Sequence, residues 1–217
     1  MSAAPLRYGL AWLAPGWRSG LRAPLPPLLA SELADWLDAG RPAVVRRRLP
    51  GEEGVPLGIA LPPGGAGRRA ALLVAPDAVA RLAPPLPLAE ALPSAPPAWR
   101  PTLASLLAEA SAAGLELAVH GSLAWQHLAG ERYLHPASDV DLLVRPADAA
   151  ALDRALALLG ARGDGPPRLD GEVLAGDAAV SWRELHAGRP ALLARQDGRA
   201  ALLPRAAFLA RLGAEAA

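Results

Sequence analysis

Two residue types that often carry chemistry are missing from this chain of 217 residues. It contains no cysteine, which excludes disulfide bonds and thiolate metal sites. It also contains no lysine, so every basic side chain is an arginine. Arginine presents a planar fork of donors that suits phosphate groups.

The chain has no marked excess of charge of one sign either. Its 22 arginines are balanced by 21 aspartates and glutamates, which gives a net charge of +1. Proteins that bind nucleic acid broadly carry a basic excess, so we expect no nucleic-acid partner. No apolar run reaches the roughly 20 residues that a membrane span needs. The N-terminal region, with Pro and Trp in its apolar part, is unlike a signal peptide. We therefore expect a soluble, cytoplasmic protein.

Apolar residues are plentiful at 52%, enough for one large domain or two small ones. Proline is also abundant, and its densest cluster covers residues 82–101. Because proline interrupts helices and central strands, we expect a linker at residues 86–101. It would join an N-terminal α+β lobe, residues 1–85, to a catalytic lobe, residues 102–217.

The first lobe contains short β-like segments. PAVVRRRL and VPLGIAL flank GEEG, a pattern that predicts a hairpin, and RRAALLVA predicts a third strand. SELADWLDAG predicts a helix that ends at Gly40. Arg46 and Arg47 are candidate phosphate contacts, although the solvated face of a strand explains them as well.

The second lobe has a clearer order of elements: helix, strand, helix, strand, helix, strand, strand. Thr102 is a candidate N-cap of the first helix and Gly114 its stop. AAVSWREL is read as the last strand. This order predicts an α/β or α+β lobe in which helices pack on a mixed sheet.

Two aspartates, Asp139 and Asp141, stand at the start of the apolar strand DVDLLV. Side chains alternate along a strand, so both carboxylates project from one face. Adjacent anions repel unless a cation sits between them, and Mg²⁺ prefers carboxylate oxygen. For an isolated D-x-D the commoner explanation is a solvated strand start.

Gly121 and Ser122 lie just upstream, where an apolar strand gives way to a helix. Glycine lets backbone N–H groups approach a ligand, and a helix N-terminus favours phosphate. Taken alone, Ser122 is explained as a helix cap. Together with the aspartate pair, these residues predict a phosphate cradle beside a metal site.

A third carboxylate would complete a two-metal site. Asp170 and Glu172 are the candidates because they lie two apart on an expected strand, although an Asp-Gly turn at 170–171 is an equal alternative. Gln126 and Arg183 are candidates for polar substrate contacts.

An apolar strand, Gly-Ser, a spacer, Asp-x-Asp and a later strand acid together resemble the nucleotidyltransferase superfamily related to polymerase β. The spacer, residues 123–138, is longer than is usual there. The stretch GSLAWQHLAGERYLHPASDVDLL, with LDGEV, AVSWREL and VVRRR, resembles the malonate decarboxylase holo-acyl-carrier-protein synthase family, the phosphoribosyl-dephospho-CoA transferases.

That resemblance implies a reaction: a serine of the apo acyl-carrier subunit attacks 2′-(5″-triphosphoribosyl)-3′-dephospho-CoA at its α-phosphate and releases pyrophosphate. It also implies an active-site role for Asp139 and Asp141. An acidic carrier would meet arginines of the first lobe. The rival hypotheses are an ATP-using nucleotidyltransferase of the same fold and an inactive nucleotide-binding adaptor.

Overall fold

The computed structural model describes residues 6–62 and 68–212. Contacts divide the chain into two compact units. One comprises Met1–Leu86 with Trp125–Tyr133, and the other Pro87–Ala124 with Leu134–Ala217. Each unit combines a sheet with helices, which confirms the expected mixed α/β class. Within the described ranges, none of the helices has the length and apolar character needed to traverse a lipid bilayer.

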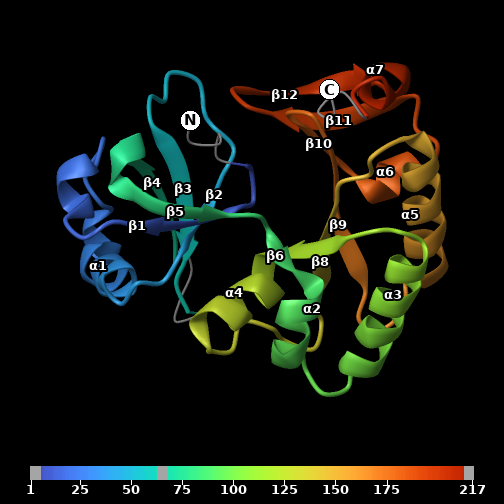
Figure 1. Ribbon diagram of the computed structural model, residues 1–217, viewed down its shortest axis with the longest axis horizontal. Coiled ribbons are helices and arrows are strands. Elements are labelled where there is room, and N and C mark those ends of the chain that lie inside the picture. The colour runs from blue at the N-terminus through green and yellow to red at the C-terminus, as the bar shows by residue number, and fades with distance from the viewer. Residues whose placement is uncertain (1–5, 63–67, 213–217) are drawn as a thin grey trace. The chain divides into compact units, whose positions relative to one another are not determined.

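The first unit is built on a five-stranded antiparallel sheet in the order β4-β3-β2-β1-β5 (Figure 1). Its strands are β1 Leu10–Leu13, β2 Ala43–Val45, β3 Val55–Ala60, β4 Arg69–Val74 and β5 Val79–Ala83. Its helices are α1 Ala30–Asp38 and the short 3-10 turns η1 Trp17–Gly20, η2 Pro27–Leu29 and η3 Pro76–Ala78. The predicted hairpin, third strand and helix are confirmed.

The apolar side of α1 supplies much of this unit's core. Leu33, Trp36 and Leu37 are buried and belong to one cluster with Val45 and Leu57 of the sheet. Such apolar residues at helical spacing are what bind an amphipathic helix to a sheet.

The long spacer of the sequence belongs partly to this first unit. The Trp125 ring packs edge-on against Trp36, with centroids 5.9 Å apart. The Tyr133 hydroxyl donates a hydrogen bond of 2.8 Å to the carbonyl oxygen of Ala60. Burial raises the pKa of Tyr133 to about 12, so its hydroxyl stays a donor at neutral pH. The extra length is thus used to complete the core of the first unit.

The second unit is built on a seven-stranded sheet in the order β12-β11-β10-β9-β8-β7-β6. Its strands are β6 Leu86–Pro87, β7 Leu117–His120, β8 Val140–Val144, β9 Leu169–Ala175, β10 Ala178–Ser181, β11 Ala191–Gln196 and β12 Arg199–Pro204. Its helices are α2 Leu88–Ala91, η4 Leu92–Ser94, α3 Arg100–Ala112, α5 Ala149–Arg162, α6 Trp182–His186 and α7 Arg205–Leu209. Helix α4 Gly121–Ala129 begins in this unit, and its residues from Trp125 onward belong to the first unit. Strand β8 pairs with β9 in parallel and with β7 in antiparallel orientation.

Four details differ from the sequence-based expectations. The strand expected to be the last, AAVSWREL, is followed by two more strands, β11 and β12. The proline-rich residues 86–101 fold as β6, α2, η4 and the start of α3. Pro93 and Pro101 stand in the first turns of η4 and α3, where no intrahelical N–H bond is lost. Helix α3 begins at Arg100, so Thr102 lies inside it rather than at its N-cap. Residues 182–186 form α6, started by the Ser181 side chain, which accepts from the Arg183 N–H.

The loop between β2 and β3 is held by an ion pair. The guanidinium of Arg46 contacts both carboxylate oxygens of Glu52, at 2.8 and 2.5 Å, and the Leu49 N–H donates to the same carboxylate at 2.7 Å. Both side chains are only about a fifth exposed, at 21% and 18%. The Arg46 hydrogen bonds hold the pKa of Glu52 below its ordinary value, against the opposing effect of partial burial.

We expect Glu52→Gln to lower the free energy of unfolding at pH 7 by about 1–3 kcal/mol, because it removes a charge-assisted pair. A carboxylate with a lowered folded-state pKa stabilises above its unfolded value and loses this effect as pH falls. The difference in unfolding free energy between wild type and variant should therefore shrink as the pH falls below 4.5, the ordinary pKa of a glutamate side chain. Urea unfolding between about pH 3 and 7 measures this. Glu53→Gln, at the exposed neighbouring position, is the control.

Candidate functional site

The register of three neighbouring strands brings the acidic residues of the second unit together. Asp141 of β8 lies directly beside Asp170 of β9 in the parallel pair and beside His120 of β7 in the antiparallel pair. Directly paired residues project from the same face of a sheet. Asp139 precedes Asp141 by two residues, so its side chain belongs to the same side.

An arginine that the sequence analysis did not single out lies among these acids. The Nη1 atom of Arg168 is 3.5 Å from Asp139 Oδ2, and its Nη2 atom is 3.5 Å from Asp170 Oδ2. The guanidinium therefore links two of the three aspartates and compensates part of their repulsion. Its spacing of two residues before Asp170 on an expected strand was the signal that could have found it.

Gly121 opens helix α4 directly against the carboxylate of Asp141. Its φ of 65° lies in the left-handed region that favours glycine. A Cβ atom added there would overlap the Asp141 carboxylate, with the Asp141 Cγ only 2.9 Å away. Ser122 follows in the first turn of the helix and is partly buried. The expectation that Gly121 and Ser122 begin a helix after a strand is confirmed.

A second glycine, which the sequence analysis considered only as part of a turn, lets β9 approach β8. Gly171 has a φ of 130°, and an added Cβ would overlap the backbone oxygen of Leu142. The Asp-Gly pair 170–171 is therefore part of β9, not the turn considered as an alternative. Asp170 also accepts a 2.8 Å hydrogen bond from the Gly171 N–H, which fixes the direction of its carboxylate.

The two candidates for the third carboxylate have different surroundings. Asp170 is adjacent to Asp141 and its side chain is 34% exposed. Glu172 is 9% exposed overall and accepts a 2.9 Å bond from the Arg195 guanidinium. Asp170 can reach a ligand in solvent, whereas Glu172 already serves an ion pair within the sheet.

Other sequence-based candidates are engaged in bonds within their own units. Arg183 donates to the carbonyl oxygens of Gly163 and Leu169, at 2.8 and 2.7 Å. The Gln126 side-chain oxygen accepts from the Tyr133 N–H at 3.0 Å, and Arg46 is paired with Glu52 as described above. For the Arg47 side chain, no bond to another described residue is seen. Their roles as substrate contacts stay predictions.

The donor chemistry of the aspartate cluster suits a hard divalent cation, which prefers carboxylate oxygen. In residues 6–62 and 68–212, however, no three acidic or histidine side chains already converge as a metal cage. Asp139 and Asp170 instead each contact Arg168 at 3.5 Å. By their chemistry, Asp139, Asp141 and Asp170 are the residues that could hold a metal.

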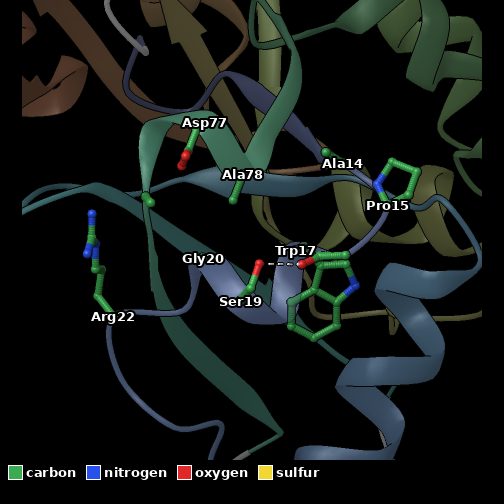
Figure 2. A pocket seen from close by; sticks show the side chains of 10 residues that line it. Ala14, Pro15, Trp17, Ser19, Gly20, Arg22, Asp77 and Ala78 are labelled. Carbon is green, nitrogen blue, oxygen red and sulfur yellow. Dashed lines mark hydrogen bonds between the residues drawn. The ribbon is translucent and has the colours of Figure 1, made fainter.

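A cavity of about 250 Å³ lies elsewhere, in the first unit (Figure 2). It is lined mainly by small residues around η1, with Arg22 and Asp77 as its ionisable side chains. None of the sequence-predicted site residues lines it. This cavity therefore does not locate the chemistry, and the aspartate cluster remains the stronger candidate.

Carboxylates gathered on neighbouring strands are able to hold the metal ions that assist the transfer of phosphate-linked groups. Two family models match the chain: "Phosphoribosyl-dephospho-CoA transferase MdcG N-terminal domain" over residues 7–85 and "Phosphoribosyl-dephospho-CoA transferase MdcG C-terminal domain" over residues 87–206. The chain therefore belongs to the phosphoribosyl-dephospho-CoA transferase family.

Relatives named phosphoribosyl-dephospho-CoA transferase support the same assignment. One from Bradyrhizobium diazoefficiens is 41% identical over 209 residues, which cover 94% of this chain and 92% of the relative. One from Xanthomonas campestris pv. campestris is 39% identical over 213 residues, covering 93% and 95%. One from Pseudomonas aeruginosa is 38% identical over 99 residues, covering 46% and 47%. No solved structure matches the chain significantly.

The contact between Gly121 and Asp141 can be tested with a matched glycine. Gly114 has nearly the same φ, 67° against 65°, but open space around its Cβ position. Both Gly→Ala variants should lose about 1–2 kcal/mol through the left-handed backbone, and Gly121→Ala should lose more because Asp141 must move. In an Asp141→Ala background this additional loss should vanish. Urea unfolding of Gly114→Ala, Gly121→Ala, Asp141→Ala and the double variant Gly121→Ala/Asp141→Ala measures it. An additional loss that persists there would contradict the contact.

Proposed function

We propose that this protein transfers the phosphoribosyl-dephospho-CoA group from 2′-(5″-triphosphoribosyl)-3′-dephospho-CoA to a serine of the apo acyl-carrier subunit of malonate decarboxylase. The observation that carries the proposal is the register of Asp141 beside Asp170, with Gly121 against Asp141, in a chain of this family. Both the family membership and the site chemistry support the same class of reaction.

The proposed reaction is a substitution at the α-phosphorus of the precursor. The serine oxygen forms a new P–O bond, the bond to the β-phosphate breaks, and pyrophosphate leaves with the electron pair. The serine proton passes to the carboxylate cluster. The product is a phosphodiester between the carrier serine and the ribose of the prosthetic group.

Each residue of the cluster has a defined task in this scheme. Asp139, Asp141 and Asp170 would hold Mg²⁺, which when bound neutralises charge on the attacking and leaving oxygens. Gly121 gives the triphosphate access to backbone N–H groups at the start of α4. Ser122 adds one hydroxyl donor at the same place.

A relationship to polymerase-β-like nucleotidyltransferases is part of the proposal. It is supported by the mixed sheet, the Gly-Ser pair at a strand-to-helix junction and the acids on adjacent strands. A cytoplasmic location is part of the proposal as well.

The acidic carrier needs a cationic surface, and the first-unit arginines fit this task less well than the sequence suggested. Arg46 is paired with Glu52 and Arg68 with Glu32, which leaves less uncompensated charge. Arg47 and Arg69 are the better candidates for the carrier, since no bond of their side chains to described residues is seen.

Intact-mass spectrometry of a purified apo carrier, after incubation with enzyme, Mg²⁺ and the precursor, tests the proposal. We expect a single added phosphoribosyl-dephospho-CoA group and stoichiometric pyrophosphate. An AMP adduct formed from ATP would instead support the rival nucleotidyltransferase. No adduct from either donor, with active carrier and fresh precursor, would contradict an enzymatic role.

In this assay, Asp139→Asn and Asp141→Asn should each lower the rate by about 10³-fold or more, because each removes a carboxylate needed to bind the metal. The fold should persist, since both side chains are partly exposed and their mutual repulsion is relieved. Thermal unfolding in metal-free buffer is the control. Near-normal turnover in either variant would refute the assigned site.

Asp170→Asn and Glu172→Gln should separate the two candidates for the third carboxylate. Asp170→Asn should lose transfer activity with little loss of stability, because its carboxylate faces solvent. Glu172→Gln should chiefly lose stability, by about 1–3 kcal/mol, because it removes the carboxylate that Arg195 contacts at 2.9 Å. Rates from the mass assay and urea midpoints measure both. The opposite pattern would assign the metal site to Glu172.

A further inference from the structure

The contacts of Arg168 differ from those of the other arginines near the cluster. Its two ion pairs are long, at 3.5 Å each, and its side chain is 53% exposed. Arg183 and Arg195, by contrast, make bonds of 2.7 to 2.9 Å to carbonyl or carboxylate oxygens. Long, exposed ion pairs contribute little to stability, so breaking those of Arg168 costs little.

The backbone of Arg168 is nevertheless fixed. Its carbonyl oxygen accepts a 2.9 Å hydrogen bond from the Val140 N–H, immediately before the β8–β9 pairing begins. The base of the side chain is therefore anchored between Asp139 and Asp170, while the guanidinium can swing without disturbing the sheet. An anchored backbone with a loosely held head group is the arrangement expected of a side chain that changes partner.

The electrostatics of the cluster favour such an exchange. Three aspartates and one arginine leave a net negative site, which attracts a divalent cation. A divalent cation and the guanidinium compete for the Oδ2 atoms of Asp139 and Asp170, because their positive charges repel each other. The displaced guanidinium then lies beside the triphosphate of the precursor, and arginine binds phosphate oxygens with two parallel N–H bonds.

We propose that the Arg168 guanidinium changes its partners. In the metal-free protein it contacts Asp139 and Asp170, and when these carboxylates bind metal it contacts the triphosphate of the precursor. This inference rests on the proposed function for the identity of the precursor. It gives Arg168 two opposite effects, competition with metal and attraction of substrate, which a purely structural arginine would not have.

Binding measurements without any carrier test the proposal. Free Mn²⁺, followed by electron paramagnetic resonance, reports the metal affinity, and calorimetric titration in saturating Mn²⁺ reports the precursor affinity. We expect Arg168→Gln to bind Mn²⁺ about three- to tenfold more tightly, because a competing positive charge is gone. It should bind the precursor about tenfold more weakly or worse, because a charge-assisted phosphate contact is lost.

Two further variants make the result specific. Arg189→Gln removes the same charge from an exposed position that no described contact joins to the three aspartates, and both affinities should stay at the wild-type value. Arg168→Lys keeps the positive charge but lacks the planar guanidinium that binds phosphate through two N–H groups. Its Mn²⁺ affinity should stay near the wild-type value, while its affinity for the precursor should fall. Thermal unfolding of each variant verifies the fold.

Weaker Mn²⁺ binding by Arg168→Gln would overturn the proposal, since the arginine would then merely support the cluster. Unchanged precursor affinity in that variant, or no Mn²⁺ binding by the wild type, would overturn it as well. If the binding results agree but the wild type transfers nothing to the carrier, the role of Arg168 stands and the proposed acceptor is wrong.

Discussion

The parallel pairing of β8 with β9 is the constraint on which the site depends. It places Asp141 beside Asp170 although 28 intervening residues separate them in the sequence. The pairing requires Gly171, because any side chain at that position would overlap the β8 backbone. A glycine that appears to be a turn signal is thus what allows two carboxylates from distant segments to share one face.

The same pairing concentrates negative charge, which opposes folding in the absence of a cation. Arg168 offsets part of this repulsion through two long ion pairs at the edge of the cluster. Short, well-buried pairs would stabilise the sheet more, but they would also hold the carboxylates too firmly to accept another ligand. The weak compensation of the aspartate charges by Arg168 is consistent with carboxylates that can release the arginine and bind another cation.

The first unit uses its polar groups differently. Arg46 and Glu52 close a loop at short distances, and the partly buried Tyr133 hydroxyl donates to the carbonyl oxygen of Ala60. These side chains stabilise local geometry, so a concentration of arginine in the sequence does not translate directly into a cationic surface. Which charges remain available to a partner is decided by the carboxylates that folding brings to them.

The sequence by itself determined the elements around the site: the alternation that puts Asp139 and Asp141 on one face, and the Gly-Ser start of α4, follow from local periodicity and backbone preference. Family resemblance was also readable from the linear motif. Only the tertiary structure decided that Asp170 rather than Glu172 adjoins Asp141, that Arg168 links the acids, and that Gly121 packs on Asp141. Strand register and order join residues far apart in the chain, and local sequence patterns alone do not decide which strands become neighbours.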